Sequence, residues 1–500
     1  MKKLFLLIAV FYCAISQAQV TWEKKLNIYH NGELAPGEPS AVIETPDKGF
    51  IITGAGRLKS TNSFIGYIYK LDSNGDSVWC KTYAGTAFGR IANVFYNNNN
   101  ELMIAMEYLI SGKKQNIIFA KVNESNGDTS NSFIAAKPNN LDGYQYTKHI
   151  EMSDGSYIVL VRDVSSFSPG ASHLFRFMPG SDAHIWNAEG LAKRVWGFYD
   201  MILDGDGVVL AGNANTGTFQ ASYIVVRYDL DGDTQWSALY PVPGDYLTSQ
   251  SYDVVAGSTN YISVGDRVVK INNILQRTPA VAIISKTGDT LSYNTLITPV
   301  PGTIRQIIKS GNKYYGIGHI LSDAKDPNNN GTTLYKMAVF EINENGSFSV
   351  VDDFDFGVLA LPNGNYLGSQ LDGFSLITAS DNDVVLLGSG HYQRSDSTDY
   401  KSAYIVKMKP GAGTNAVNPA ITENLNIYPN PSSGYLTIIN NGKEGSLKIT
   451  SLLGQEVFNQ PIEGNAETTV ISLNHLPAGT YVVVFECAEG ILTERLVIVE

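Results

Sequence analysis

The chain has little charge, and its positive charge is the scarcer of the two. Of its 500 residues, 17% are charged, with 36 lysine and arginine residues against 48 aspartate and glutamate residues, for a formal net charge of -12. The basic residues are scattered and form no cluster that would neutralise several phosphates. The composition therefore argues against nucleic acid as a partner.

Long hydrophobic runs are also missing, except at the N-terminus. Two lysines precede an apolar stretch from Leu4 to Ile15, and small residues follow it. This stretch is too short for a membrane anchor, the alternative reading, which needs roughly 20 apolar residues. We predict a signal peptide over residues 1–18, cleaved between Ala18 and Gln19, and no transmembrane segment after it.

Cysteine is scarce, with three residues in the chain. Cys13 lies in the predicted signal peptide and leaves with it, whereas Cys80 and Cys487 fall in different predicted domains. A disulfide framework is therefore not expected, although export permits disulfides. We expect both remaining cysteines to be buried as small apolar side chains.

Contiguous catalytic motifs are absent as well. The sequence has no His-Glu-x-x-His pattern, no Gly-x-Ser-x-Gly elbow and no phosphate-binding glycine loop. One metal candidate remains in a polar segment: Asp326, Asn328 and Asn330 have the spacing that begins a calcium loop. Met337 stands where that loop needs a bidentate glutamate, so an ordinary polar loop is the alternative. Calcium is the only cofactor that the sequence suggests.

Glycine (47 residues) and tyrosine (28 residues) are abundant, which favours short strands joined by tight turns and predicts an all-β chain. One hairpin pattern recurs: an alternating strand, a turn containing glycine, and a strand that often carries Trp. Its seven copies, 52 to 65 residues apart, centre on Gly75, Gly127, Gly180, Gly232, Gly288, Gly346 and Gly411. A second tight-turn hairpin precedes each copy, and four strands in roughly 50 residues is the size of a propeller blade.

We therefore predict a seven-bladed β-propeller over residues 19–411, followed by a small C-terminal β-sandwich. Stacked sandwiches or an open solenoid are rival architectures, but no distinct capping repeat is visible. The fifth and sixth units are the least regular, which leaves six or eight blades as alternatives.

The two tight turns of each unit lie at one end of its strands, so the longer connections gather on the opposite face of the ring. We call this the long-loop face and expect a ligand there. Trp196 falls beside a connection between units, next to Arg194, and such a pair is typical of a binding anchor. The alternative is that Trp196 only fills the ring interior. The other predicted ligand-binding residues end or follow long connections: Arg90, Tyr392 and Arg394.

The seventh unit supplies three strands and then runs into residues 412–423, which have the composition of a linker. Its missing outer strand would leave a row of unpaired backbone groups. Residues 20–29 match the outer-strand pattern of the other units, with Trp22 in the position of Trp79. We predict that residues 20–29 pair antiparallel with residues 403–408 and close the ring.

The C-terminal residues carry three motifs in a fixed order: Tyr-Pro-Asn-Pro at 428–431, Leu-Pro-Ala-Gly-Thr-Tyr at 476–481 and a terminal apolar strand. Through these motifs, residues 424–500 resemble the type A C-terminal sorting domain of the type IX secretion system. The resemblance implies a β-sandwich, the type IX machinery as partner, and a location outside the cell or on the outer-membrane surface after passage through the periplasm.

Two functions fit these features. The first is a non-enzymatic binding or adhesion protein whose long-loop face meets a glycan or a protein. The second is a secreted carbohydrate-active or other hydrolase or lyase whose active site is assembled from several blades, since such a site leaves no contiguous motif.

Overall fold

The computed structural model describes strands and turns between residues 19 and 498, and in that part it has no helix, so none that could span a bilayer. The predicted signal peptide and linker lie outside the described residues, which are 19–35, 37–58, 60–84, 88–110, 114–135, 144–163, 172–181, 183–188, 195–217, 220–240, 249–271, 274–296, 300–321, 335–354, 359–360, 366–367, 369–393, 399–409, 426–428, 432, 434–440, 443–451, 456–463, 468–473, 476–487 and 490–498. The chain divides into two units, Met1–Thr414 and Asn415–Glu500.

Seven four-stranded antiparallel sheets form the first unit in its described ranges. Six of them use consecutive strands: β4 (Gly37–Glu44), β5 (Phe50–Arg57), β6 (Phe64–Leu71) and β7 (Ser77–Ala84); β8 (Phe88–Tyr96), β9 (Leu102–Ile110), β10 (Lys114–Val122) and β11 (Thr129–Ile134); β12 (Tyr144–Glu151), β13 (Tyr157–Asp163), β14 (Ser172–Phe177) and β15 (His184–Ala188); β16 (Val195–Asp204), β17 (Gly207–Gly217), β18 (Gln220–Asp229) and β19 (Thr234–Tyr240); β20 (Gln250–Ala256), β21 (Asn260–Ile271), β22 (Ile274–Ser285) and β23 (Thr290–Thr295); β24 (Gly302–Ser310), β25 (Lys313–Leu321), β26 (Tyr335–Ile342) and β27 (Phe348–Phe354).

The seventh sheet combines the two ends of the unit: β30 (Ser369–Thr378), β31 (Val384–Gln393) and β32 (Asp399–Lys409) are completed by β1 (Gln19–Leu26). Two short hairpins accompany the sheets: β2 (Tyr29–His30) with β3 (Glu33–Leu34), and β28 (Leu359–Ala360) with β29 (Tyr366–Leu367).

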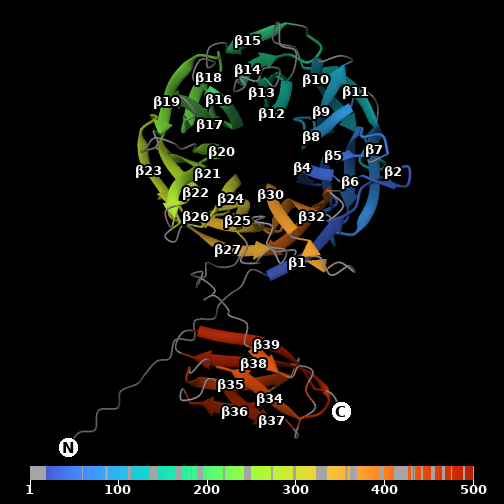
Figure 1. The fold of residues 1–500 in the computed structure, drawn as a ribbon. Helices are drawn as coiled ribbons and strands as arrows, with labels where there is room; N and C mark the ends of the chain where they lie inside the picture. Colours follow the sequence, from blue (N-terminus) through green and yellow to red (C-terminus); the bar gives the residue numbers. More distant parts are fainter. Residues whose placement is uncertain are drawn as a thin grey trace, which may run out of the picture. The chain divides into compact units, whose positions relative to one another are not determined.

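The sheets follow one another around a ring, with the first strand of each nearest the centre (Figure 1). Each pair of neighbouring sheets shares a hydrophobic cluster, including the last sheet and the first. In the cluster between the first two sheets, Ile51 and Ile68 pack with Val94 and Ile104. Because both faces of the middle strands are covered in this way, those strands are almost continuously apolar. The all-β propeller predicted from the repeat is confirmed.

The ring closes through β1, which pairs antiparallel with β32 from Gln19↔Lys409 to Leu26↔Ala403. The predicted pairing of the N-terminal segment with residues 403–408 is confirmed, but the strand ends at Leu26. Tyr29, which was expected to belong to it, lies in the β2–β3 hairpin instead. Leu26 and Ile28 are buried in the cluster that joins the last sheet to the first.

A tryptophan on an outer strand locks that sheet to the next. The Trp22 ring packs over Gly75, in the turn between the third and fourth strands of the following sheet, and its indole nitrogen donates a 3.1 Å hydrogen bond to the Ser73 carbonyl. The same ring-over-glycine contact recurs at three further outer-strand tryptophans: Trp79 on Gly127, Trp186 on Gly232 and Trp236 on Gly288. The recurring Gly and Trp of the sequence are thus two halves of one contact between neighbouring sheets.

One prediction about the body is wrong. Cys80, expected to be buried, is a free and exposed cysteine on β7. It lies on the outermost strand of its sheet, where the next sheet no longer covers both faces of the strand. The other cysteine, Cys487, has no side-chain description.

The C-terminal unit is the predicted small β-sandwich. One sheet consists of β33 (Asn426–Tyr428), β34 (Tyr435–Ile439) and β37 (Thr468–Ser472). The other consists of β35 (Gly445–Ser451), β36 (Glu456–Ile462), β38 (Gly479–Cys487) and β39 (Gly490–Ile498). Alternate side chains from both sheets form a single core that includes Leu436, Ile438, Ile449, Val483 and Leu496.

We expect Gly75→Ala to lower the free energy of unfolding by more than Gly180→Ala. Both glycines occupy the same turn position, with φ of +80° and +81°, so both variants pay a backbone cost of about 1–2 kcal/mol. Only at Gly75 does a tryptophan ring lie 2.7 Å from the added Cβ, whereas nothing lies within 4 Å at Gly180. Displacing Trp22 should add about 1–3 kcal/mol to the loss of unfolding free energy in Gly75→Ala. Urea unfolding measures the difference in stability between the two variants. Equal losses of unfolding free energy would contradict a stabilising contact between Trp22 and Gly75.

Candidate functional site

The seven innermost strands share one irregularity. The strand register shifts by one residue at the equivalent place in each of them, as expected of a β-bulge. The residues skipped in the pairing are Ser40, Ala92, Thr147, Tyr199, Tyr252, Arg305 and Phe374. A bulge leaves its residue outside the ladder and re-aims the side chain, so seven such positions form a ring of side chains around the centre of the propeller.

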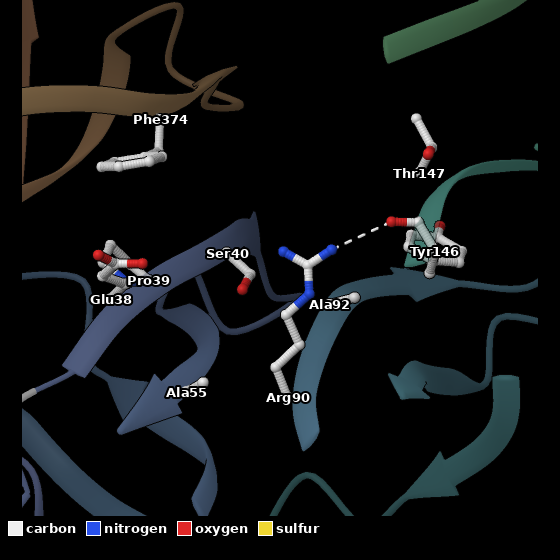
Figure 2. Close-up of a pocket in the computed structure, with 9 residues that line it drawn as sticks. All are labelled: Glu38, Pro39, Ser40, Ala55, Arg90, Ala92, Tyr146, Thr147 and Phe374. Atoms are coloured by element: carbon white, nitrogen blue, oxygen red, sulfur yellow. Dashed lines mark hydrogen bonds between the residues drawn. The ribbon is translucent and has the colours of Figure 1, made fainter. Parts of the chain in front are cut away.

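Four of these bulge residues line a central pocket of about 230 Å³: Ser40, Ala92, Thr147 and Phe374. Arg90 also lines it, and Figure 2 shows its guanidinium between the strands that carry Ser40 and Tyr146. The Arg90 guanidinium donates to Glu107 at 3.0 Å and to the Tyr146 carbonyl at 3.1 Å. Its Nε atom is buried without a hydrogen-bond partner. This wall of the pocket thus holds a cation that is only partly satisfied.

The other three bulge residues, together with Arg162 of β13, form a continuous row that we call the Arg–Tyr arc. The guanidinium of Arg162 lies 5.8 Å from the ring centre of Tyr199, and the rings of Tyr199 and Tyr252 are 5.2 Å apart. The guanidinium of Arg305 lies 4.4 Å from the ring centre of Tyr252. All four side chains are half-buried, so the arc presents aromatic surface and cationic groups to the same space.

A buried carboxyl lies behind the arc. Asp266 of β21 pairs with Gln250, whose side chain accepts a hydrogen bond from the Tyr252 hydroxyl. The Asp266 side chain is 1% exposed and lies 3.5 Å from Arg277. Burial raises the pKa of Asp266 to about 6, although Arg277 and Arg305 act in the opposite direction.

The residues that follow the bulges connect neighbouring sheets. Lys148 donates to Asp200 at 2.6 Å, and the Asp253 carboxylate accepts the Ile307 amide at 2.8 Å. Burial raises the pKa of Asp253 well above its usual range, and the nearby Asp200 adds to the effect. These contacts hold the innermost strands together from one sheet to the next, so we assign them a structural role.

Of the ligand-binding residues predicted from the sequence, only Arg90 has a described side chain, and it lines the central pocket. Trp196 belongs to β16 at a further register shift, and Tyr392 pairs with Tyr400 in the last sheet, but neither side chain is described. Arg194 and Arg394 lie outside the described residues, so their predicted roles stay predictions.

The predicted calcium ligands Asp326, Asn328 and Asn330 also lie outside the described residues. In the part of the chain that is described, no three carboxylate, histidine or cysteine side chains come together as a metal site. At the predicted cleavage site, Ala18 is not described and Gln19 begins β1.

Sequence comparison identifies the C-terminal unit. Residues 426–499 match the family described as the secretion system C-terminal sorting domain. The C-terminal unit is a type IX secretion sorting domain. Such domains mark proteins that the type IX system exports to the cell surface or releases, which confirms the predicted destination of this chain.

The whole chain matches no curated protein. Among solved structures it is similar to a subtype N11 neuraminidase-like protein from A/flat-faced bat/Peru/033/2010 (H18N11), at 8% identity and a TM-score of 0.34, over 80% of this chain and 96% of that one. It is also similar to the β-propeller domain of the Trilobed protease from Pyrococcus furiosus, at 9% identity and a TM-score of 0.40, over 73% of this chain and 96% of that one. Sqt1 from Chaetomium thermophilum gives 11% identity and a TM-score of 0.41, over 78% of this chain and 100% of that one. At these scores no function is transferred from them.

We expect the stability of the protein to fall as pH rises through the titration of Asp266. Its carboxyl has a pKa of about 6 in the folded state and about 3.9 when unfolded, so the folded state holds the proton more tightly. The resulting stabilisation is complete below pH 4 and is lost between pH 4 and about pH 6. Urea unfolding across this pH range should show that the free energy of unfolding falls less for Asp266→Asn than for the wild type. Parallel profiles would show that Asp266 titrates normally.

Proposed function

We propose that the propeller body is a non-enzymatic binding module, carried out of the cell by the sorting domain, and that a saccharide binds at the Arg–Tyr arc. The observation that carries this proposal is the pair of neighbouring rings, Tyr199 and Tyr252, held at bulges on adjacent innermost strands and left partly exposed. Aromatic rings offer flat apolar area, while their hydroxyls and the flanking guanidinium groups offer hydrogen bonds. That combination suits the alternating C–H and hydroxyl surfaces of a sugar.

The position of the arc supports the same proposal. Its residues come from four consecutive sheets, and the central pocket is lined from the remaining sheets and the third. Concave sites lined by aromatic groups with a few polar groups are typical of small-molecule sites. A ligand entering from the long-loop face would meet both groups of residues.

A secreted hydrolase or lyase is the second candidate, and Asp266 is the observation that favours it. A carboxyl with a pKa near 6 beside Tyr252 and Arg277 has the properties of a general acid. However, its side chain is 1% exposed, so a substrate oxygen reaches it only if the side chains around it move. We therefore rank binding first.

We expect Tyr252→Ala to weaken saccharide binding about 5- to 30-fold, because the variant loses a stacking surface worth about 1–2 kcal/mol. Tyr29→Ala is the matched control, since Tyr29 is 55% exposed on the β2–β3 hairpin, away from the innermost strands. A glycan array selects the ligand, and calorimetry then compares the variants. Equal affinities for the two variants would show that the Arg–Tyr arc does not bind the saccharide. Release of a cleaved product would favour the hydrolase or lyase.

The sorting domain makes a separate prediction about routing. Without residues 424–500 the body should accumulate in the periplasm, because the predicted signal peptide would still direct passage across the inner membrane but the outer-membrane step would lack its tag. Cell fractionation of this variant beside the full chain, expressed at the same level, measures the effect. Normal amounts of the truncated protein in the medium would refute the role of the domain.

A further inference from the structure

The arginines of the body are unevenly distributed. Eight have described positions, and two of these, Arg176 and Arg227, lie at the tight-turn end of their strands. The other six lie toward the strand ends that meet at the long-loop face: Arg57, Arg90, Arg162, Arg267, Arg277 and Arg305. The described arginines of the body are therefore concentrated toward one face of the ring.

Half of these eight arginines are neutralised by a nearby carboxylate among the described residues. At the tight-turn end, Arg176 pairs with Asp154 at 2.8 Å and Arg227 with Asp206 at 2.6 Å. Toward the long-loop face, Arg90 pairs with Glu107 and Arg277 with Asp266. These ion pairs account for four of the eight.

The other four have no ion pair among the described residues. Arg57 and Arg267 lie over the rings of Phe64 and Tyr293, and the remaining two belong to the arc. Arg162 donates to the neutral side-chain amide of Gln145 at 2.5 Å, and Arg305 contacts the Tyr252 ring. Among the described residues, neither has a carboxylate within ion-pair distance. A half-buried guanidinium keeps most of its five N–H donors directed at its surroundings, and leaving such a charge uncompensated is costly. A bound anion would supply the missing partner, often through two parallel hydrogen bonds.

We propose, on the basis of the binding function above, that the ligand is an acidic saccharide whose carboxylate or sulfate group is held by Arg162 and Arg305 while its sugar ring rests on Tyr199 and Tyr252. The two arginines stand at opposite ends of the tyrosine pair, so successive acidic residues of one chain can meet both. The ligand class is thus a uronate-containing or sulfated glycan, and a neutral glycan leaves both guanidinium groups without a partner.

The test compares saccharides that differ only in charge. Calorimetry measures binding of the mature chain to a galacturonate hexamer, to its fully methyl-esterified form, and to a sulfated and an unsulfated galactose hexamer. The acid should bind at least tenfold more tightly than its ester, and the affinity should fall as salt rises. A preference for the sulfated galactose hexamer over the unsulfated one supports the same site with sulfate as the anion.

Substitutions of single arginines test which guanidinium groups bind the acidic group of the ligand. Arg305→Gln should lower the affinity for the preferred acidic hexamer about tenfold and lower the affinity for its neutral counterpart by clearly less, and Arg162→Gln should act in the same direction. Arg227→Gln on the tight-turn side is the matched control, and thermal unfolding checks that each variant is folded. Equal binding of charged and neutral partners overturns the acidic-ligand inference while the saccharide-binding function stands. Failure of any saccharide to bind, on these probes and on the array, overturns both.

Discussion

Backbone hydrogen bonding between β1 and β32 is the interaction on which the ring depends. Every other sheet of the body is built from consecutive strands, whereas the last sheet takes its fourth strand from the other end of the unit. Without β1, the edge of β32 would be unpaired and the last sheet would have no tryptophan to place over Gly75 of the first. The same few residues therefore complete a sheet, join two sheets and bury Leu26 in their shared core.

The candidate site is a by-product of the same repeated architecture. A ring of sheets brings seven equivalent strand positions together at its centre, and the bulge at each of them turns one side chain out of the ladder. The scaffold fixes where these side chains lie, and the identity of each residue fixes the chemistry. Small residues on one side leave the central pocket open, and the aromatic and cationic residues on the other supply contact surface.

Much of this fold could be read from the sequence because its signals are local. Glycine at a positive φ marks the turns, tryptophan marks the outer strands, and the missing strand of the last unit points to the N-terminus. The extent of the closing strand could not be read, because the apolar alternation continues past Leu26 while the pairing ends there. The exposure of Cys80 was also missed, since alternation along a strand does not reveal whether a neighbouring sheet covers it.

The site residues were harder to predict, because a bulge interrupts the period of two on which strand predictions rest. Tyr199, Tyr252 and Arg305 look like ordinary positions within apolar strands, and only the three-dimensional ring places them side by side. A signal does exist in the aligned repeats: Ser40, Thr147 and Phe374 each stand seven residues before a turn aspartate, namely Asp47, Asp154 and Asp381. Tyr199 has the same spacing to Asp206, so aligning the repeats by their turns would have pointed to the bulge position.

The closing strand also sets the order of folding. β1 is synthesised first, yet its partner β32 ends at Lys409, so the earliest strand of the body must wait for the last before the ring is complete. Pairings between such distant segments slow folding, because a long loop must close before the contact stabilises the chain. Before β32 is available, Glu23, Lys24 and Lys25 place three charges on the unpaired β1 segment. These charges hinder its pairing with another chain. The ring of the body therefore cannot close until almost all of the body has been made.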